Sequence, residues 1–137
     1  METRKHETYV SLEVAKLLKQ AGFNWNINSC YNCYGIPILS TDMGVYSNYN
    51  EDKNIISAPT LTVAQKWLRE VKGWDIDIIT NREHIGIFYE CDCIDKNVRV
   101  FKPQSGKDIT PFLFDTYEEA LAAGIKNCLE LILEEDE

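Results

Sequence analysis

The feature that most constrains the fold is a run of five predicted elements within residues 59–133. An amphipathic helix is predicted over residues 60–72, with apolar side chains recurring on one face. Residues 74–78 then alternate between apolar and acidic, the period of a half-buried strand, and two more strand-like runs follow. Residues 116–119, Thr-Tyr-Glu-Glu, form a capping box that opens a second long helix. This α-β-β-β-α unit predicts an α+β domain with an antiparallel sheet and helices packed on one face.

The strands of this unit have predicted limits. Residues 80–83 are polar and are interpreted as a loop after the first strand. The second strand, residues 85–93, alternates so that Cys91 and Cys93 share its apolar face. A turn at residues 95–97 leads into a short third strand, and a loop precedes the last helix.

An additional helix is predicted near the N-terminus, over residues 11–21. Ser11 is a suitable N-cap, and Gly22 is suited to the left-handed position that ends a helix. Residues 60–73 repeat this layout, with Thr60 and Gly73 in the corresponding places. Either a weak internal duplication or convergence of two capped helices explains the repetition.

The segment between these helices, residues 24–56, has an unusual composition. Between residues 24 and 50 the only charged side chain is Asp42, among six asparagines and five tryptophan or tyrosine rings. We expect a hairpin or short meander that extends the sheet. Tyrosine and asparagine suit adaptable recognition, because the ring supplies contact area and the amide supplies hydrogen bonds. The predicted contact surface for a partner protein or a second copy consists of Tyr31, Tyr34, Tyr46 and Tyr49.

The charge of the chain is concentrated at one end. The 137 residues carry a net charge of −8, and residues 115–137 hold eight acids against Lys126. Residues 134–137 form an acidic tail, and the negative charge of the last helix and this tail would repel phosphate backbones. The length fits one domain, residues 1–137, and no apolar run reaches the ~20 residues of a membrane span. Because residues 1–7 also lack the apolar stretch of a signal peptide, we expect a cytoplasmic protein that does not enter a membrane.

The five cysteines are expected to be reduced thiols, since their number is odd and no export signal is recognised. One alternative is a structural zinc site formed by Cys30, Cys33, Cys91 and Cys93. Against it, alternate residues of a strand lie ~7 Å apart, whereas zinc ligands close in sequence usually occupy tight turns. We therefore expect no metal and no cofactor.

Catalysis has one partial signature. Asp75, Asp77, Glu90 and Asp92 fall on adjacent predicted strands, as the carboxylates of metal-dependent nucleases do. Those enzymes place a lysine two residues after the glutamate, and this chain has Asp92 there. A small metal-dependent enzyme that uses these acids stays an alternative, and no catalytic residue is assigned.

Two partial matches concern nucleic acids. Residues 13–18 look like the first helix of a winged-helix DNA reader of the excisionase type, but residues 23–28 do not continue as a recognition helix. The unit at residues 59–133 resembles the double-stranded RNA-binding domain in its order of elements. That domain holds phosphates with lysines at the start of its last helix. Here Asp115, Glu118 and Glu119 occupy that place, so nucleic-acid binding is an alternative and not the expectation.

A resemblance covers most of the chain. The sequence segments that carry the resemblance are YVSLEVAKLL (residues 9–18), APT (58–60), AQKWLRE (64–70), YEEAL (117–121) and GI (124–125). They are similar to small uncharacterised proteins of gut Bacteroides-type bacteria and their phages or mobile elements. The resemblance implies a genomic setting and no mechanism. The leading hypothesis is therefore a non-enzymatic accessory or protein-binding module of a phage or mobile element.

Overall fold

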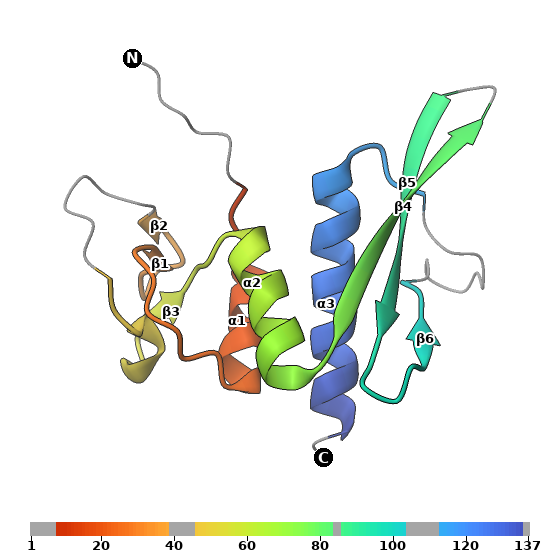
Figure 1. The fold of residues 1–137 in the computed structure, drawn as a ribbon. Helices are drawn as coiled ribbons and strands as arrows, with labels where there is room; N and C mark the ends of the chain where they lie inside the picture. The colour runs from red at the N-terminus through yellow and green to blue at the C-terminus, as the bar shows by residue number, and fades with distance from the viewer. Residues whose placement is uncertain (1–7, 39–45, 84–85, 104–112, 136–137) are drawn as a thin grey trace.

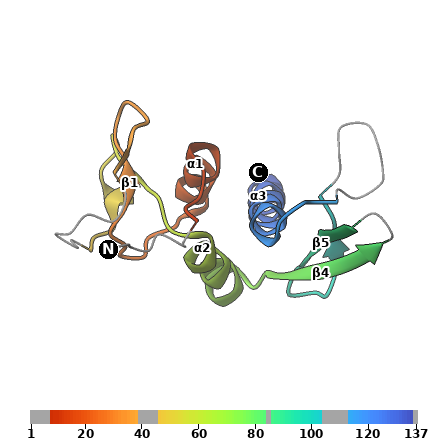
Figure 2. The same ribbon diagram turned by 90° about the horizontal axis from the view of Figure 1, so that it is seen from above.

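The computed structural model describes residues 8–38, 46–83, 86–103 and 113–135. In this part of the chain, the helices lie between two small antiparallel sheets (Figures 1 and 2). The first sheet lies beside helix α1 (Leu12–Ala21), and the second lies on the far side of helix α3 (Tyr117–Glu135). Helix α2 (Leu61–Trp67) crosses close to both α1 and α3. The predicted α+β class is confirmed.

Helix α1 begins and ends where its capping residues predict. The Ser11 hydroxyl accepts a hydrogen bond from the Val14 N–H at 3.2 Å, which satisfies one of the free donors at the helix start. Gly22 ends the helix at φ 100°, a left-handed conformation that costs glycine little. The buried face of α1 consists of Val14, Ala15, Leu18 and Ala21.

Helix α2 is capped by Thr60, whose hydroxyl accepts from the Val63 N–H at 3.2 Å. It continues as a π-helical turn, Leu68–Lys72, before Gly73 ends it at φ 75°. Trp67 is 1% exposed, and its ring packs against Phe23 in a T-shaped arrangement, with 5.4 Å between the ring centroids. The second helix is therefore anchored in the core by a large aromatic side chain.

The first sheet corrects the prediction that residues 24–56 extend the main sheet. Strands β1 (Cys30–Tyr31), β2 (Pro37–Ile38) and β3 (Ile56–Ser57) form a sheet of their own in the order β2-β1-β3, with a 3₁₀ turn, Tyr49–Glu51, before β3. The asparagines explain the short strands, because their side chains compete for backbone donors. Asn32 Oδ1 accepts from the N–H groups of Tyr34 and Ile36, at 2.8 and 3.0 Å.

The second sheet has the order β4-β5-β6, formed by β4 (Asp75–Glu83), β5 (Gly86–Ile94) and β6 (Val100–Phe101). Ile76 pairs with Cys93 and Ile78 with Cys91, so these four side chains share one face. The prediction of a loop at residues 80–83 was wrong, since the ladder continues to the pair Glu83 and Gly86. Cross-strand pairing thus overrides the polar character of this stretch.

Helix α3 packs between the second sheet and the other two helices (Figure 2). The Thr116 hydroxyl accepts from the Glu119 N–H at 3.0 Å, as the capping box predicts. The face of α3 toward the core is apolar and buried, and it includes Leu121, Ile125, Cys128 and Leu129.

Among the described residues, no helix is long and apolar enough to cross a membrane.

Candidate functional site

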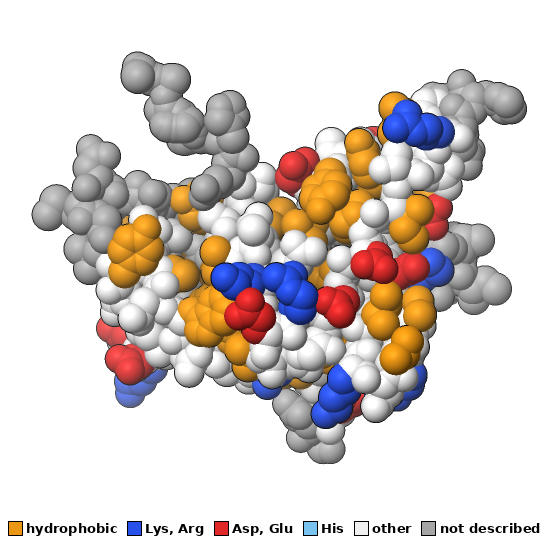
Figure 3. All heavy atoms as spheres, in the orientation of Figure 1, with side chains coloured by type: hydrophobic (Ala, Val, Ile, Leu, Met, Phe, Trp, Pro, Cys, Tyr) orange, Lys and Arg blue, Asp and Glu red, His pale blue; other side chains and the backbone are white. Residues whose placement is uncertain are grey.

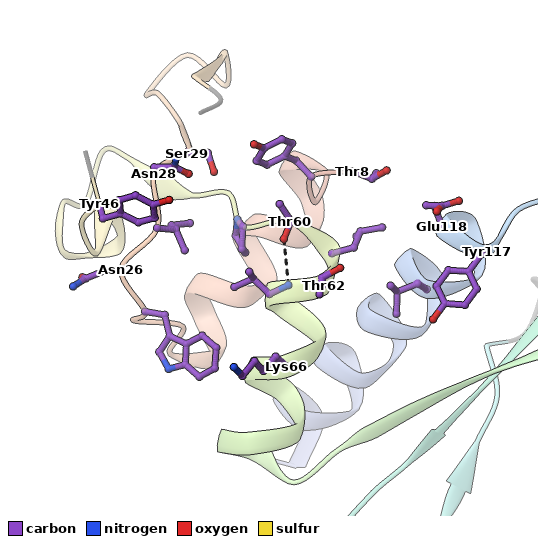
Figure 4. A pocket seen from close by; sticks show the side chains of 17 residues that line it. Thr8, Asn26, Asn28, Ser29, Tyr46, Thr60, Thr62, Lys66, Tyr117 and Glu118 are labelled. Atoms are coloured by element: carbon purple, nitrogen blue, oxygen red, sulfur yellow. Dashed lines mark hydrogen bonds between the residues drawn. The ribbon is translucent and has the colours of Figure 1, made fainter. Parts of the chain in front are cut away.

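A groove of about 710 Å³ opens where the N-terminal segments meet the first turns of α2 and α3 (Figure 4). This size is typical of cavities that hold a ligand or a few side chains of a partner. Seventeen residues from five segments of the chain line it: Thr8, Tyr9, Trp25, Asn26, Ile27, Asn28, Ser29, Tyr46, Pro59, Thr60, Leu61, Thr62, Val63, Lys66, Tyr117, Glu118 and Leu121.

Backbone pairing fixes the walls of this groove. Tyr9 and Thr60 form an isolated antiparallel bridge, which holds the N-terminal segment against the start of α2. Ile27 and Ser47 exchange two backbone hydrogen bonds, at 3.0 and 2.9 Å, on the other wall. The lining residues are therefore attached to a hydrogen-bonded frame, which lowers the entropic cost of binding.

Aromatic side chains lie on two sides of the groove. Tyr46 and Asn26 lie on one side of α2, whereas Tyr117 and Glu118 lie on the other, with Thr62 between them (Figure 4). Tyr46 is 66% exposed and Tyr117 is 45% exposed. The Tyr117 ring packs against Tyr89 in a T-shaped arrangement, with 6.3 Å between the ring centroids. This contact restricts the rotation of the Tyr117 ring.

The lining holds one basic and one acidic side chain, Lys66 and Glu118. Lys66 Nζ lies 4.0 Å from Glu70 Oε2 on the same exposed helix face, a pairing of little energetic weight. No described residue forms an ion pair with the exposed Glu118 carboxylate. On this face of the molecule, hydrophobic patches are separated by a mixed group of basic and acidic side chains (Figure 3).

The four tyrosines of the predicted contact surface do not share one surface. Tyr46 lines the groove, and Tyr34 is 83% exposed at the turn between β1 and β2. Tyr31 is half-buried, and its hydroxyl donates to the Val10 carbonyl at 2.7 Å. Tyr49 is half-buried and packs against the core. The structure thus leaves Tyr34 and Tyr46 available for contact, and the role of these residues stays a prediction.

The four cysteines of the zinc alternative lie in two places. Cys30 and Cys33 belong to the first sheet and its turn, whereas Cys91 and Cys93 are on β5, against α3. Within the described ranges, no group of three or more His, Cys, Asp or Glu residues is arranged to hold a metal ion. The arrangement therefore does not assemble a four-thiolate site.

Cys91 and Cys93 instead share the buried space beneath α3 with Cys128. The Cys93 thiol donates to the Gly124 carbonyl at 3.3 Å, and Asn127 Nδ2 lies 3.5 Å from its sulfur. Burial, followed by the neighbouring Cys93, raises the pKa of Cys91 to about 12. A hydrogen bond to Cys93 and burial raise the pKa of Cys128 as well. With raised pKa values, the thiols of Cys91 and Cys128 stay protonated at neutral pH and act as small hydrophobic core residues.

The strand acids of the enzyme alternative lie on the solvent face of the second sheet. Asp77 is directly opposite Asp92, and Asp92 forms an ion pair with Lys102. Glu90 accepts a hydrogen bond from Asn81 Nδ2 at 2.7 Å. The ion pair with Lys102 and the hydrogen bond from Asn81 account for Asp92 and Glu90 without a metal.

Sequence reasoning missed the groove residues that come from α2 and α3. In the sequence, Tyr117 and Glu118 belong to the capping box that opens the last helix, and Lys66 belongs to the predicted helix at residues 60–72. A signal was present in Tyr117, an aromatic residue in the first turn of an otherwise acidic helix start. That Tyr117 lines the same groove as Tyr46 could not be inferred, because it depends on how α2 packs between the two segments.

Comparison of the chain with protein-family models, with curated proteins and with solved structures finds no match.

Proposed function

We propose that this protein is a non-enzymatic binding module whose groove holds an extended segment of a partner protein. The setting we propose is the cytoplasm of a bacterial host, as an accessory protein of a phage or mobile element. The observation that carries the proposal is the position of Tyr46. This ring comes from the asparagine- and tyrosine-rich segment, is 66% exposed, and lines the groove of about 710 Å³.

The chemistry of the lining supports binding to a protein. Asn26 and Thr62 present an amide and a hydroxyl at exposed positions in the groove, where a peptide backbone can use them as donors and acceptors. Tyr46, Tyr117 and the partly buried Trp25 add aromatic area, which usually dominates interface energies. Few charges must lose their water on binding, so the desolvation cost is small.

A display selection with a random dodecapeptide library tests this function. Peptides enriched on the wild-type protein should lose about tenfold or more in affinity with Tyr46→Ser, because interface tyrosines commonly contribute that much. Tyr34→Ser is the matched control, since Tyr34 is also exposed to solvent but lies outside the groove.

Two outcomes would contradict the proposal. The first is a selection that enriches no peptide. The second is binding that depends on Tyr34 and not on Tyr46, which would move the contact surface to the turn between β1 and β2.

A further inference from the structure

We infer that the partner segment carries an acidic residue that pairs with Lys66 and a basic residue that pairs with Glu118, which fixes its direction in the groove. This inference rests on the proposed function, and it adds the chemistry and orientation of the partner. The starting observation is that the lining holds one charge of each sign, on different helices.

The two charges lie at separate places along the groove. Lys66 is on the second turn of α2, on the side where Asn26 lies, and Glu118 is in the first turn of α3, beside Tyr117 (Figure 4). They form no ion pair with each other. A ligand that spans the groove therefore meets a positive charge near one end and a negative charge near the other.

Both charged groups are available to a partner. The Lys66 side chain is 56% exposed, and its separation of 4.0 Å from Glu70 is at the limit of an ion pair. Glu118 is exposed, and the described part of the chain offers its carboxylate no ion pair. A partner that supplies opposite charges gains both interactions without breaking a strong internal one.

The space between the charges favours apolar or aromatic partner side chains. Leu121 and Val63 belong to the same lining and contribute apolar surface, and Tyr117 is held in place by Tyr89. A ring that is already fixed loses little entropy when a partner packs on it. The expected partner segment thus has an acidic residue, an apolar or aromatic centre, and a basic residue.

The same charges disfavour other ligand classes. A nucleic-acid backbone would bring phosphates to Glu118 and to the neighbouring acids Asp115 and Glu119, where they are repelled. A neutral ligand would leave Lys66 and Glu118 partly desolvated and unpaired, which costs free energy. A peptide with both signs of charge matches the groove best.

Exchange of the two charges gives the test. The dodecapeptide selection is run in parallel on the wild-type protein and on the double variant Lys66→Glu/Glu118→Lys, which has the same net charge. Wild type should enrich peptides with an acid and a base in one order and at a constant spacing. The double variant should enrich the reverse order. A wild-type consensus peptide should bind the double variant about tenfold more weakly, with a loss that shrinks as salt rises.

The matched control exchanges charges outside the groove. Arg69→Glu/Glu119→Lys alters two exposed residues on the same helices that do not line the groove, and it should select the wild-type order. Circular dichroism melts show whether each variant is folded. The single variants Lys66→Met and Glu118→Gln provide a second measurement. Peptides selected on Lys66→Met should lack the conserved acidic residue, and peptides selected on Glu118→Gln should lack the conserved basic residue.

The outcomes separate this inference from the proposed function. Peptides that depend on Tyr46 but show no charge pattern, or keep their order on the exchanged variant, overturn the inference and leave the binding function standing. Peptides that bind independently of Tyr46, or no enriched peptide at all, overturn both. Comparable binding of a 20-mer single-stranded DNA at ~150 mM salt also overturns the inference, because phosphates should be repelled.

Discussion

Gly124 of α3 lies so close to Ile76 of β4 that a Cβ at position 124 would be 2.8 Å from Ile76 Cγ2. This contact sets how closely the last helix approaches the second sheet. It also lets the Gly124 carbonyl accept the Cys93 thiol hydrogen bond at 3.3 Å. Glycine is thus required at this position by packing, although it weakens a helix by about 1 kcal/mol relative to alanine.

The first prediction is that Gly124→Ala destabilises the protein. Overpacking a core typically costs about 1–3 kcal/mol, which exceeds the gain in helix propensity, so we expect a net loss of about 1 kcal/mol. Urea unfolding of the variant measures this loss. In an Ile76→Ala background, the same substitution should become neutral or stabilising, since the clashing methyl is gone. Equal losses in both backgrounds would show that the contact is not the cause.

Acid sensitivity should centre on Asp95. This side chain is 6% exposed and accepts hydrogen bonds from the N–H groups of Asn97 and Arg99 and from Arg99 Nε. Burial raises the pKa of Asp95, but these hydrogen bonds and the Arg99 charge outweigh burial and hold it below its ordinary value. A lowered folded-state pKa contributes stability above about pH 4, which is lost as the pH falls through the folded-state value.

The expected outcome is that Asp95→Asn lowers the urea midpoint at pH 7, and that the difference from wild type shrinks below about pH 4. Glu130→Gln, at an exposed position on α3, is the control and should follow wild type at every pH. A difference between Asp95→Asn and wild type that stays constant from pH 7 to about pH 2 would exclude the titration of Asp95 as its source.

The parts of the fold that the sequence predicted depend on local chemistry. Ser11, Thr60 and Thr116 accept from an N–H three residues ahead, so their role can be inferred from adjacent sequence. Gly22 and Gly73 end their helices in left-handed conformations for the same local reason. Alternation of apolar residues likewise located β4 and β5.

The separate first sheet could not be predicted, because distant hydrogen bonds define it. Asn50 Nδ2 donates to the Phe23 carbonyl at 2.9 Å, and Asn50 Oδ1 accepts from the Ser57 N–H at 2.8 Å. One side chain thus ties three segments together. The groove escaped prediction for a similar reason, since Tyr46 and Tyr117 line one hollow only after α2 packs between them.

A strained residue provides a route to a more stable variant. Val98 has φ 65°, the only positive φ of a non-glycine residue in the described ranges, and a β-branched residue rarely adopts it. Its side chain is 76% exposed, so packing does not compensate. Val98→Asn should stabilise the protein by about 1 kcal/mol in urea unfolding, because asparagine tolerates the left-handed region. Val100→Asn, at an exposed strand position nearby, is the control and should give no gain. A gain at both positions would instead point to a general effect of surface polarity.

The last prediction concerns the reactivity of the thiols. Cys33 is exposed, whereas Cys30, Cys91, Cys93 and Cys128 are buried. Burial also raises the pKa values of Cys30 and Cys91, which lowers the fraction of reactive thiolate at neutral pH. In the folded protein, Ellman's reagent should therefore titrate one thiol quickly, and the other four only after guanidinium is added. Cys33→Ser should abolish the fast phase and leave the total after unfolding lower by one. A second fast thiol would contradict the prediction, and three or more would show that the interface beneath helix α3 opens more readily than its packing implies, because Cys30 alone of the buried thiols lies in the first sheet.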